Sequence, residues 1–214
     1  MKKEDISKEQ LDKILECFLE SMMKNGLKGT TMDSLASSLQ MSKRTIYEIF
    51  GTKEDLFREV HKHFNDKMAK KMRSIFLSSS NVMEGIIKCF IYNRDLMSDL
   101  SAEFIRDMQT YANNRSFITD IQRRQHYDNL YEVLQRGVEE GFFREDLNLL
   151  VLCRVFILQM EALKRTEELF PSDISLIEIY DNIIVGFLRG ISTLNGMEEL
   201  EKYLPTFKTI ATEK

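Results

Sequence analysis

Residues 30–55 read TTMDSLASSLQMSKRTIYEIFGTKED. Met32 and Leu35 stand at helical spacing after a threonine pair, and a threonine hydroxyl there can accept an unpaired amide of the first helical turn. A second short helix follows Ser42, which we expect to cap it. Because only three or four residues separate the two predicted helices, the stretch favours a helix-turn-helix over residues 31–50, whose second helix fits the major groove of DNA.

The second predicted helix has two faces. Its apolar spacing turns Ile46, Ile49 and Phe50 inward, so the outward residues are Lys43, Arg44, Thr45, Tyr47 and Glu48. Thr52, with Asp55 three residues later, is typical of the capped start of a third helix. A helical hairpin without any DNA contact can cap and pack in the same way, so this pattern alone leaves both readings open.

The strings TTMDSLA and MSKRTIYEIFGTKEDL closely resemble the DNA-binding domain of the TetR (tetracycline-repressor) family of bacterial regulators. In that family a threonine pair opens helix 2, Ser-x-x-Thr-x-Tyr-x-x-Phe spans helix 3, and Lys-Glu-x-Leu starts helix 4. The resemblance covers roughly residues 8–64. It implies a DNA-binding domain over residues 1–64 and a helical effector-binding and dimerisation domain over residues 65–214.

The resemblance also implies a function and a set of DNA contacts. Most members repress transcription, and an effector bound in the C-terminal domain releases them from DNA. We expect base contacts at the start of the second helix, phosphate contacts from a hydroxyl and an ammonium group, and two caps that also meet phosphate. The expected base contacts are Lys43, Arg44 and Thr45. The expected phosphate contacts are Tyr47 and Lys53, and the two caps are Thr31 and Ser42.

One position departs from the family pattern. The turn of the helix-turn-helix often carries glycine, and this chain has Gln40 there. A residue other than glycine is strained at positive φ. We therefore expect a turn of slightly different geometry.

The whole chain indicates an all-α protein. It has 214 residues with two prolines and nine glycines, and no alternating β pattern stands out. There is no secretion signal and no window of ~18 uncharged apolar residues, so we expect a cytoplasmic protein without a membrane span. The net charge of −4 does not exclude DNA binding, because phosphate contact needs only a local positive face.

Cys17, Cys89 and Cys153 are odd in number and lie among apolar residues. This setting favours reduced core cysteines, with a redox sensor as the alternative.

Apolar periodicity and capping signals divide the rest of the chain into helices. Ser7 and Gln10 form a predicted capping box for the first helix, and Gly26 is expected to end it in a left-handed conformation. The later helices are predicted over about 53–76, after the break at 78–81, around 104–112, and over 116–140, 147–158, 174–194 and 197–204, with Gly137 and Gly141 closing the helix at 116–140.

The effector site is predicted only loosely. Asn93 lies on an apolar helical stripe, where a buried amide needs partners, so it is either satisfied within the core or faces a ligand cavity. Abundant phenylalanine and methionine favour a flexible apolar cavity among the helices between about residues 82 and 158. The candidates for its polar contacts are Asn93, Tyr111, Tyr127, Gln159 and Glu161.

The helices at 147–158 and 174–194 are apolar nearly all round, so they must be covered on more than one side. Their own chain covers one side, and a second copy can cover the other, which matches the resemblance to a family that commonly dimerises through its last two long helices. Gly186 and Gly190 share one face of the second of these helices. That face either packs closely within the chain or meets its symmetry mate.

The sequence gives little support for an enzyme. His61 and His63 diverge on a helix, and no cysteine pair, glycine-rich phosphate loop or nucleophile elbow occurs. We expect no catalytic residues, no metal and no cofactor. The expected partners are a palindromic DNA operator, a small, largely apolar effector and a second copy of the chain. The alternative is a helical adaptor of the same fold that does not bind DNA.

Overall fold

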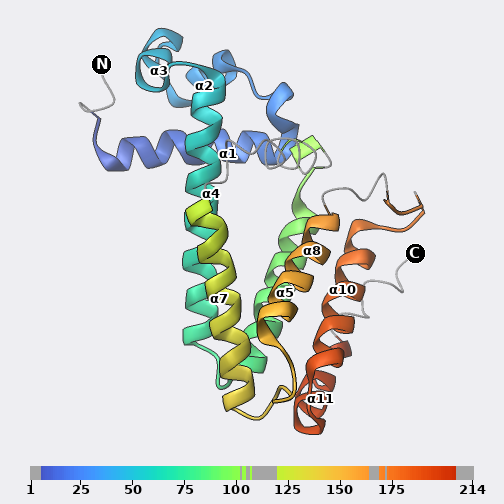
Figure 1. Ribbon diagram of the computed structural model, residues 1–214. Helices are drawn as coiled ribbons and strands as arrows, with labels where there is room; N and C mark the ends of the chain where they lie inside the picture. Colours follow the sequence, from blue (N-terminus) through green and yellow to red (C-terminus); the bar gives the residue numbers. More distant parts are fainter. Residues whose placement is uncertain are drawn as a thin grey trace. The chain divides into compact units, whose positions relative to one another are not determined.

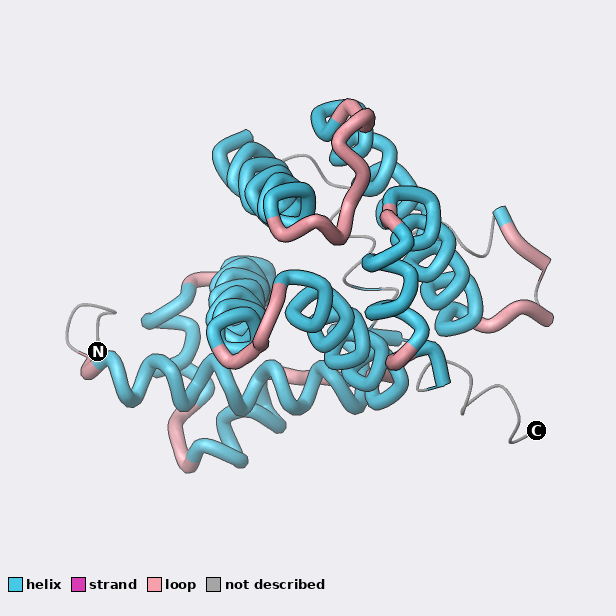
Figure 2. The backbone as a smooth tube through the Cα atoms, turned by 90° about the horizontal axis from the view of Figure 1, so that it is seen from below, coloured by secondary structure: helices cyan, strands magenta, loops and turns pink. Residues whose placement is uncertain are grey.

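The computed structural model describes residues 6–101, 103–104, 107, 120–163, 169–171 and 173–205, and for 120–126 it describes the backbone alone. These residues form helices joined by short loops (Figures 1 and 2). Apart from one bridge between Phe143 and Ser192, they contain no β structure. The all-α prediction is confirmed. The helices are α1 (Lys8–Gly29), α2 (Met32–Leu39), α3 (Lys43–Phe50), α4 (Lys53–Leu77), α5 (Val82–Asp99), α7 (Asp120–Glu139), α8 (Leu149–Ala162), α10 (Leu176–Ile191) and α11 (Leu194–Glu201).

The chain forms two compact units. Unit 1 comprises Met1–Lys71 and Leu100–Phe117, and unit 2 comprises Met72–Asp99 and Ile118–Lys214. The sequence placed a single division between residues 64 and 65. Two differences stand out: α4 continues past that point, and the chain re-enters unit 1 directly after α5.

Unit 1 is built on α1. Its apolar stripe packs against α2, α3 and the first half of α4, and Phe18, Met22, Ile46 and Phe57 are fully buried in the shared core. The predicted capping box at the start of α1 is present: Gln10 N donates to Ser7 Oγ over 3.2 Å, and Ser7 N donates back to Gln10 Oε1 over 3.3 Å. α1 therefore forms the support on which the helix-turn-helix rests.

The end of α1 differs slightly from the prediction. Gly26 does adopt a left-handed φ of 67°, but one further turn follows before the helix ends at Gly29. Thr30 closes this turn, because its fully buried hydroxyl donates to the Gly26 carbonyl over 2.9 Å. Thr31 then caps α2, so the two adjacent threonines have different structural tasks.

Unit 2 packs α5 against α7, α10 and α11, and α8 against α7 and α10. Its core holds Phe143, Leu134 and Ile184 among its fully buried side chains. Gly137 was expected to help end α7, but it lies inside the helix, where an added Cβ would come within 2.1 Å of the Phe143 ring. Gly141 closes the helix alone, with a φ of 76°.

A buried ion pair joins α5 to α10. Arg94 is only 3% exposed, and its Nε lies 2.9 Å from each carboxylate oxygen of Asp181, donating a hydrogen bond to Oδ2. Burial raises the pKa of Asp181, and the Arg94 guanidinium partly offsets that rise. Removing either partner would leave an uncompensated charge in the interior.

All three cysteines are free, and Cys89 and Cys153 are buried. Burial raises the pKa of the Cys89 thiol to about 12 and also raises the pKa of the other two. A thiol held in its neutral form is a poor nucleophile, so this environment suits core packing better than redox sensing.

Candidate DNA-binding surface and ligand groove

The helix-turn-helix of unit 1 is held by its own polar side chains. Thr31 Oγ1 accepts from Ser34 N over 3.0 Å at the start of α2. Ser42 Oγ accepts from Thr45 N over 3.0 Å at the start of α3 and lies 2.7 Å from the Thr45 hydroxyl. Both predicted caps are therefore present.

Gln40 occupies the turn in the left-handed conformation that the family usually gives to glycine. Its φ is 53° and its ψ is 35°, and the following residue, Met41, donates from its amide to the Ala36 carbonyl over 2.9 Å. Gln40 therefore bears the strain of a residue other than glycine at positive φ.

α3 has one apolar face and one polar face, as predicted. Ile46, Ile49 and Phe50 are buried in the core of unit 1. Lys43, Arg44, Tyr47 and Glu48 are exposed, and Thr45 is half-buried beside its cap. The exposed face thus offers an ammonium, a guanidinium and hydroxyl groups along one short helix.

The two cations of α3 are each paired with a carboxylate. Lys43 Nζ lies 2.8 Å from Asp33 Oδ2, and Arg44 Nε lies 2.8 Å from Glu48 Oε1. The hydrogen bond to Asp33 raises the pKa of Lys43, so this lysine stays cationic. Exposed ion pairs contribute little free energy. A phosphate or a base edge can therefore replace the carboxylate at small cost.

Lys53 begins α4 and has a different environment. Its Nζ donates to the Leu27 carbonyl over 2.5 Å, in the last turn of α1. Burial lowers the pKa of Lys53, while the charges of Glu54 and Asp107 act in the opposite direction. Just ahead of it, Thr52 and Asp55 form the predicted reciprocal cap, with N–H to side-chain distances of 3.2 and 3.0 Å.

This arrangement matches known proteins. Residues 14–60 match the family model described as bacterial regulatory proteins, tetR family. The HTH-type transcriptional repressor KstR2 of Mycobacterium tuberculosis is 26% identical over 140 residues, which cover 63% of this chain and 70% of that protein. The chain is a TetR-family regulator.

Solved structures share the fold of this TetR-family chain. A transcriptional regulator from Cytophaga hutchinsonii superposes with a TM-score of 0.68 at 19% identity, over 86% of this chain and 99% of that one. A cysteine mutant of the TetR-family regulator CifR superposes with a TM-score of 0.56 at 16% identity, over 86% of this chain and 97% of that one. That structure contains a 26-bp double-strand operator DNA.

Of the candidate ligand residues, four lie in the described part of the chain, on α5, α7 and α8. Asn93 Nδ2 lies 3.9 Å from Met72 Sδ, and Tyr127 donates its hydroxyl to the Leu150 carbonyl over 3.2 Å. Glu161 is exposed on α8, and Tyr111 lies outside the described residues. Gln159 alone among the five lines a hollow described in unit 2.

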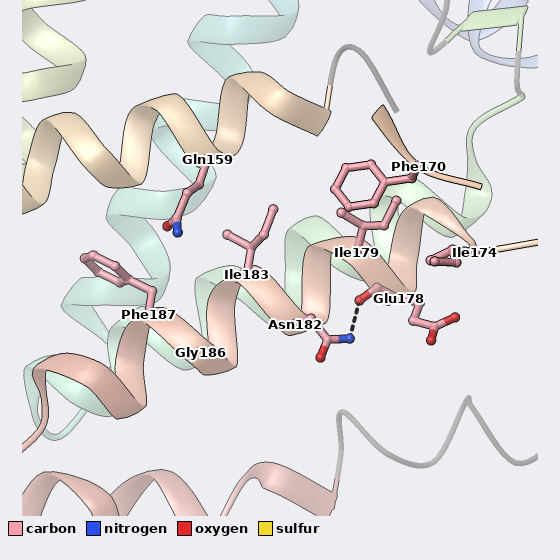
Figure 3. A pocket seen from close by; sticks show the side chains of 9 residues that line it. All are labelled: Gln159, Phe170, Ile174, Glu178, Ile179, Asn182, Ile183, Gly186 and Phe187. Atoms are coloured by element: carbon pink, nitrogen blue, oxygen red, sulfur yellow. Dashed lines mark hydrogen bonds between the residues drawn. The ribbon is translucent and has the colours of Figure 1, made fainter. Parts of the chain in front are cut away.

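That hollow is an open groove of about 410 Å³ between α8 and α10. Gln159 points from α8 toward α10, and Phe170 lies over the start of α10 (Figure 3). The floor carries Ile183 and Phe187, and Asn182 donates from Nδ2 to the Glu178 carbonyl over 2.8 Å. The groove is mainly apolar with an amide at each side.

Sequence reasoning missed the α10 part of this groove. Glu178, Asp181 and Asn182 interrupt the apolar run of α10, and Glu178 and Asn182 lie one helical turn apart, which is a signal for a polar strip on that helix. The sequence analysis instead predicts a helix that is apolar nearly all round, over 174–194. The polar side chains of α10 were therefore visible in the sequence.

Neither a metal site nor a membrane span is found in the described part of the chain. No group of three or more histidine, cysteine or acidic side chains there could hold a metal ion. His63 instead pairs with Glu16 over 3.0 Å, joining α4 to α1. Among the described helices, none combines the length and apolar character needed to cross a bilayer.

Proposed function

We propose that this TetR-family chain is a ligand-responsive repressor that holds an operator through the exposed face of α3 and leaves it when a small, largely apolar effector binds unit 2. The observation that carries the proposal is the two-faced α3. Its apolar side is buried in the core of unit 1, and its outer side presents Lys43, Arg44 and Tyr47. An adaptor of the same fold would have no use for this donor-rich surface.

The proposal gives these side chains distinct roles. Lys43, Arg44 and Thr45 meet base edges in the major groove, as expected of the first residues of a recognition helix. Tyr47 and Lys53 hold phosphate. The amides and hydroxyls at Thr31 and Ser42 combine capping with phosphate contact. Since chromosomal DNA is the target, the proposal places the protein in the cytoplasm.

Binding to duplexes selected from random DNA, or to DNA that flanks the protein's own gene, tests this function. A bidentate base contact contributes about 1–3 kcal/mol of discrimination, whereas a phosphate contact weakens all sequences alike. Arg44→Ala should therefore relax sequence preference. Lys53→Ala should lower affinity for every duplex and reduce the slope of log K against log salt by about 1.

Asp66→Ala, an exposed change on α4 in the same unit and without a proposed DNA contact, is the control. Wild-type affinity, preference and salt slope in both variants would refute the site assignment. A wild-type protein that selects no sequence at all would favour the adaptor reading.

We further propose a homodimer through α8 and α10. α8 exposes Leu150, Val151, Val155 and Leu158, the last with 64% of its surface accessible. An added Cβ at Gly186 or Gly190 of α10 would meet nothing within 4 Å among the described residues. Contiguous exposed apolar surface is typical of interaction sites, so a second copy is the proposed cover.

Two-fold symmetry has a consequence for the operator. Dimeric helix-turn-helix proteins place their recognition helices in successive major grooves, about 34–36 Å apart. The proposed operator is accordingly a palindrome with half-sites about one helical turn apart.

For the effector, the proposal retains Asn93, Tyr111, Tyr127, Gln159 and Glu161 as candidate contacts in unit 2. The mainly apolar groove at Gln159 supports a largely apolar compound with one or two hydrogen-bonding groups. A compound that raises the melting temperature and also releases DNA would be the effector.

A further inference from the structure

The last turn of α1, residues 26–29, is held by several contacts. Gly26 has a left-handed φ of 67°, and its carbonyl accepts both from Thr30 N over 3.2 Å and from Thr30 Oγ1 over 2.9 Å. Leu27, the next residue, is buried in the core of unit 1. This turn leads directly into the helix-turn-helix, so its geometry bears on the DNA-binding surface.

Both backbone polar groups of Leu27 form hydrogen bonds. Its amide donates to the Asp107 carboxylate, and its carbonyl accepts from Lys53 Nζ over 2.5 Å. Asp107 and Lys53 therefore hold the same residue of the turn, one through each of its backbone polar groups. A movement of Leu27 would move the anchor point of Lys53.

Asp107 belongs to a segment that docks firmly on unit 1. Ser101 N donates to the Met23 carbonyl over 3.1 Å, and Phe104 is fully buried with its ring 6.1 Å from that of Phe64. An added Cβ at Gly26 would lie 2.7 Å from Glu103 Cβ and 2.9 Å from Asp107 Oδ2. The segment approaches the turn as closely as a glycine allows.

We propose that Asp107 is a positioning residue for DNA binding: by fixing Leu27, it fixes the point from which Lys53 reaches a phosphate. This inference rests on the proposed function, which gives Lys53 its phosphate contact. A lysine ammonium has three donors, so one can remain on the Leu27 carbonyl while the others meet phosphate. Holding a long side chain by one such bond lowers the conformational entropy lost on binding.

A simple electrostatic role predicts the opposite. Asp107 carries a negative charge near a proposed phosphate contact, so removing that charge would strengthen binding by reducing repulsion. Two substitutions separate these roles. Asp107→Asn keeps an oxygen that accepts from the Leu27 amide and removes the charge, whereas Asp107→Ala removes both.

The test is fluorescence anisotropy of the full chain on a duplex selected by the wild type, between 50 and 200 mM salt. Asp107→Ala is expected to bind about five- to tenfold more weakly, with a salt slope lower by about 1 and unchanged sequence preference. Asp107→Asn should stay within about twofold of the wild type. Glu103→Ala is the matched control, because Glu103 has the same charge in the same segment and alanine keeps its Cβ.

A double-mutant cycle shows whether Asp107 acts through Lys53. In a Lys53→Ala background, Asp107→Ala should change affinity by less than about twofold, since the side chain it positions is gone. Full additivity of the two losses would overturn the proposal, as would an alanine variant that binds as well as, or more tightly than, the wild type.

The outcomes also separate this inference from the function on which it rests. A wild type that binds neither selected nor flanking DNA removes the proposed function. A wild type that binds, with unchanged Asp107 variants, removes only the role of Asp107. Should Asp107→Ala not fold, Asp107→Glu keeps the charge but displaces the oxygen from the Leu27 amide. A loss of about threefold or more there supports positioning, and wild-type affinity overturns it.

Discussion

Asp33 and Glu48 show, at the scale of single residues, how the proposed DNA-binding face of α3 is held partly neutral. Each carboxylate accepts from a cation of the α3 surface, at 2.8 Å in both cases. The chain as a whole carries a net charge of −4. If α3 binds DNA as proposed, these internal partners are exchanged for groups on DNA, which moderates affinity for unrelated sequences.

This exchange gives the first prediction. Asp33→Asn should free Lys43 and raise affinity for specific and non-specific duplexes alike, by about two- to fivefold at low salt, because one repulsive charge is lost. The measurement is anisotropy titration against both duplexes at two salt concentrations. Asp66→Asn, an exposed change on α4 in the same unit, is the control. A gain confined to the specific duplex would contradict this account.

Single residues also show how far sequence reasoning reaches. Thr31, Ser42 and Thr52 cap their helices as predicted, because a cap needs only a side chain three residues from its partner amide. The bonds from Asp107 to Leu27 and from Lys53 to Leu27 span 80 and 26 residues. Local pattern carries no information about such contacts.

At the scale of helices, the contact between α1 and α4 depends on a charged cluster. Glu16 accepts from His63 Nε2 over 3.0 Å and also pairs with Lys67. Burial acts to raise the pKa of Glu16, but the hydrogen bonds from Lys67 and His63 outweigh it, so the pKa lies below its ordinary value of 4.5. A lowered carboxyl pKa stabilises the fold above pH 4.5, and this stabilisation is lost as the pH falls through the folded value.

Glu16→Gln tests the predicted direction in which the contribution of Glu16 to stability changes with pH. The variant should be less stable than the wild type near pH 7, by a free energy of unfolding on the order of 0.5 kcal/mol for a partly exposed pair. The two proteins should converge as the pH falls below 4.5 through the lowered pKa of Glu16. Thermal unfolding followed by circular dichroism across this range is the measurement. Glu20→Gln, one turn further along the exposed side of α1, is the control. A gap that stays constant with pH would mean that Glu16 acts through packing alone.

Helix boundaries show where prediction fails and why. Helices were expected over 174–194 and 197–204, whereas α10 ends at Ile191 and α11 begins at Leu194. The cause is a distant turn: Arg144 N donates to the Ile191 carbonyl, and Thr193 N donates to the Phe142 carbonyl, both over 2.9 Å. Thr193 then caps α11 with its hydroxyl. These bonds break the helix in mid-run, which apolar periodicity cannot reveal.

For the whole molecule, the central question is whether α8 and α10 form the dimer. Gly190→Leu is a sharp test, because the substitution should stabilise the helix itself but destabilise a dimer. Leucine should stabilise the isolated helix by roughly 0.8–1 kcal/mol relative to glycine, and a Cβ at position 190 meets no described atom within 4 Å. At a helix–helix interface, the same side chain would force two copies apart.

The expected variant is folded, monomeric and weak on a full palindromic operator. Sedimentation analysis and melting curves are the measurements, with Glu132→Leu on the exposed side of α7 as the control for added surface leucine. An intact dimer with unchanged operator affinity would remove Gly190 from the interface. A monomeric wild type would refute the dimer itself.

The exposed apolar side of α8 also bears on gene dosage. When most chains are single, the concentration of pairs grows with the square of the concentration of chains. Halving the amount of protein in a cell would then reduce the paired form by about fourfold. A regulator built on such a surface would respond steeply to its own expression level, so small changes in its synthesis would be amplified at the genes it controls.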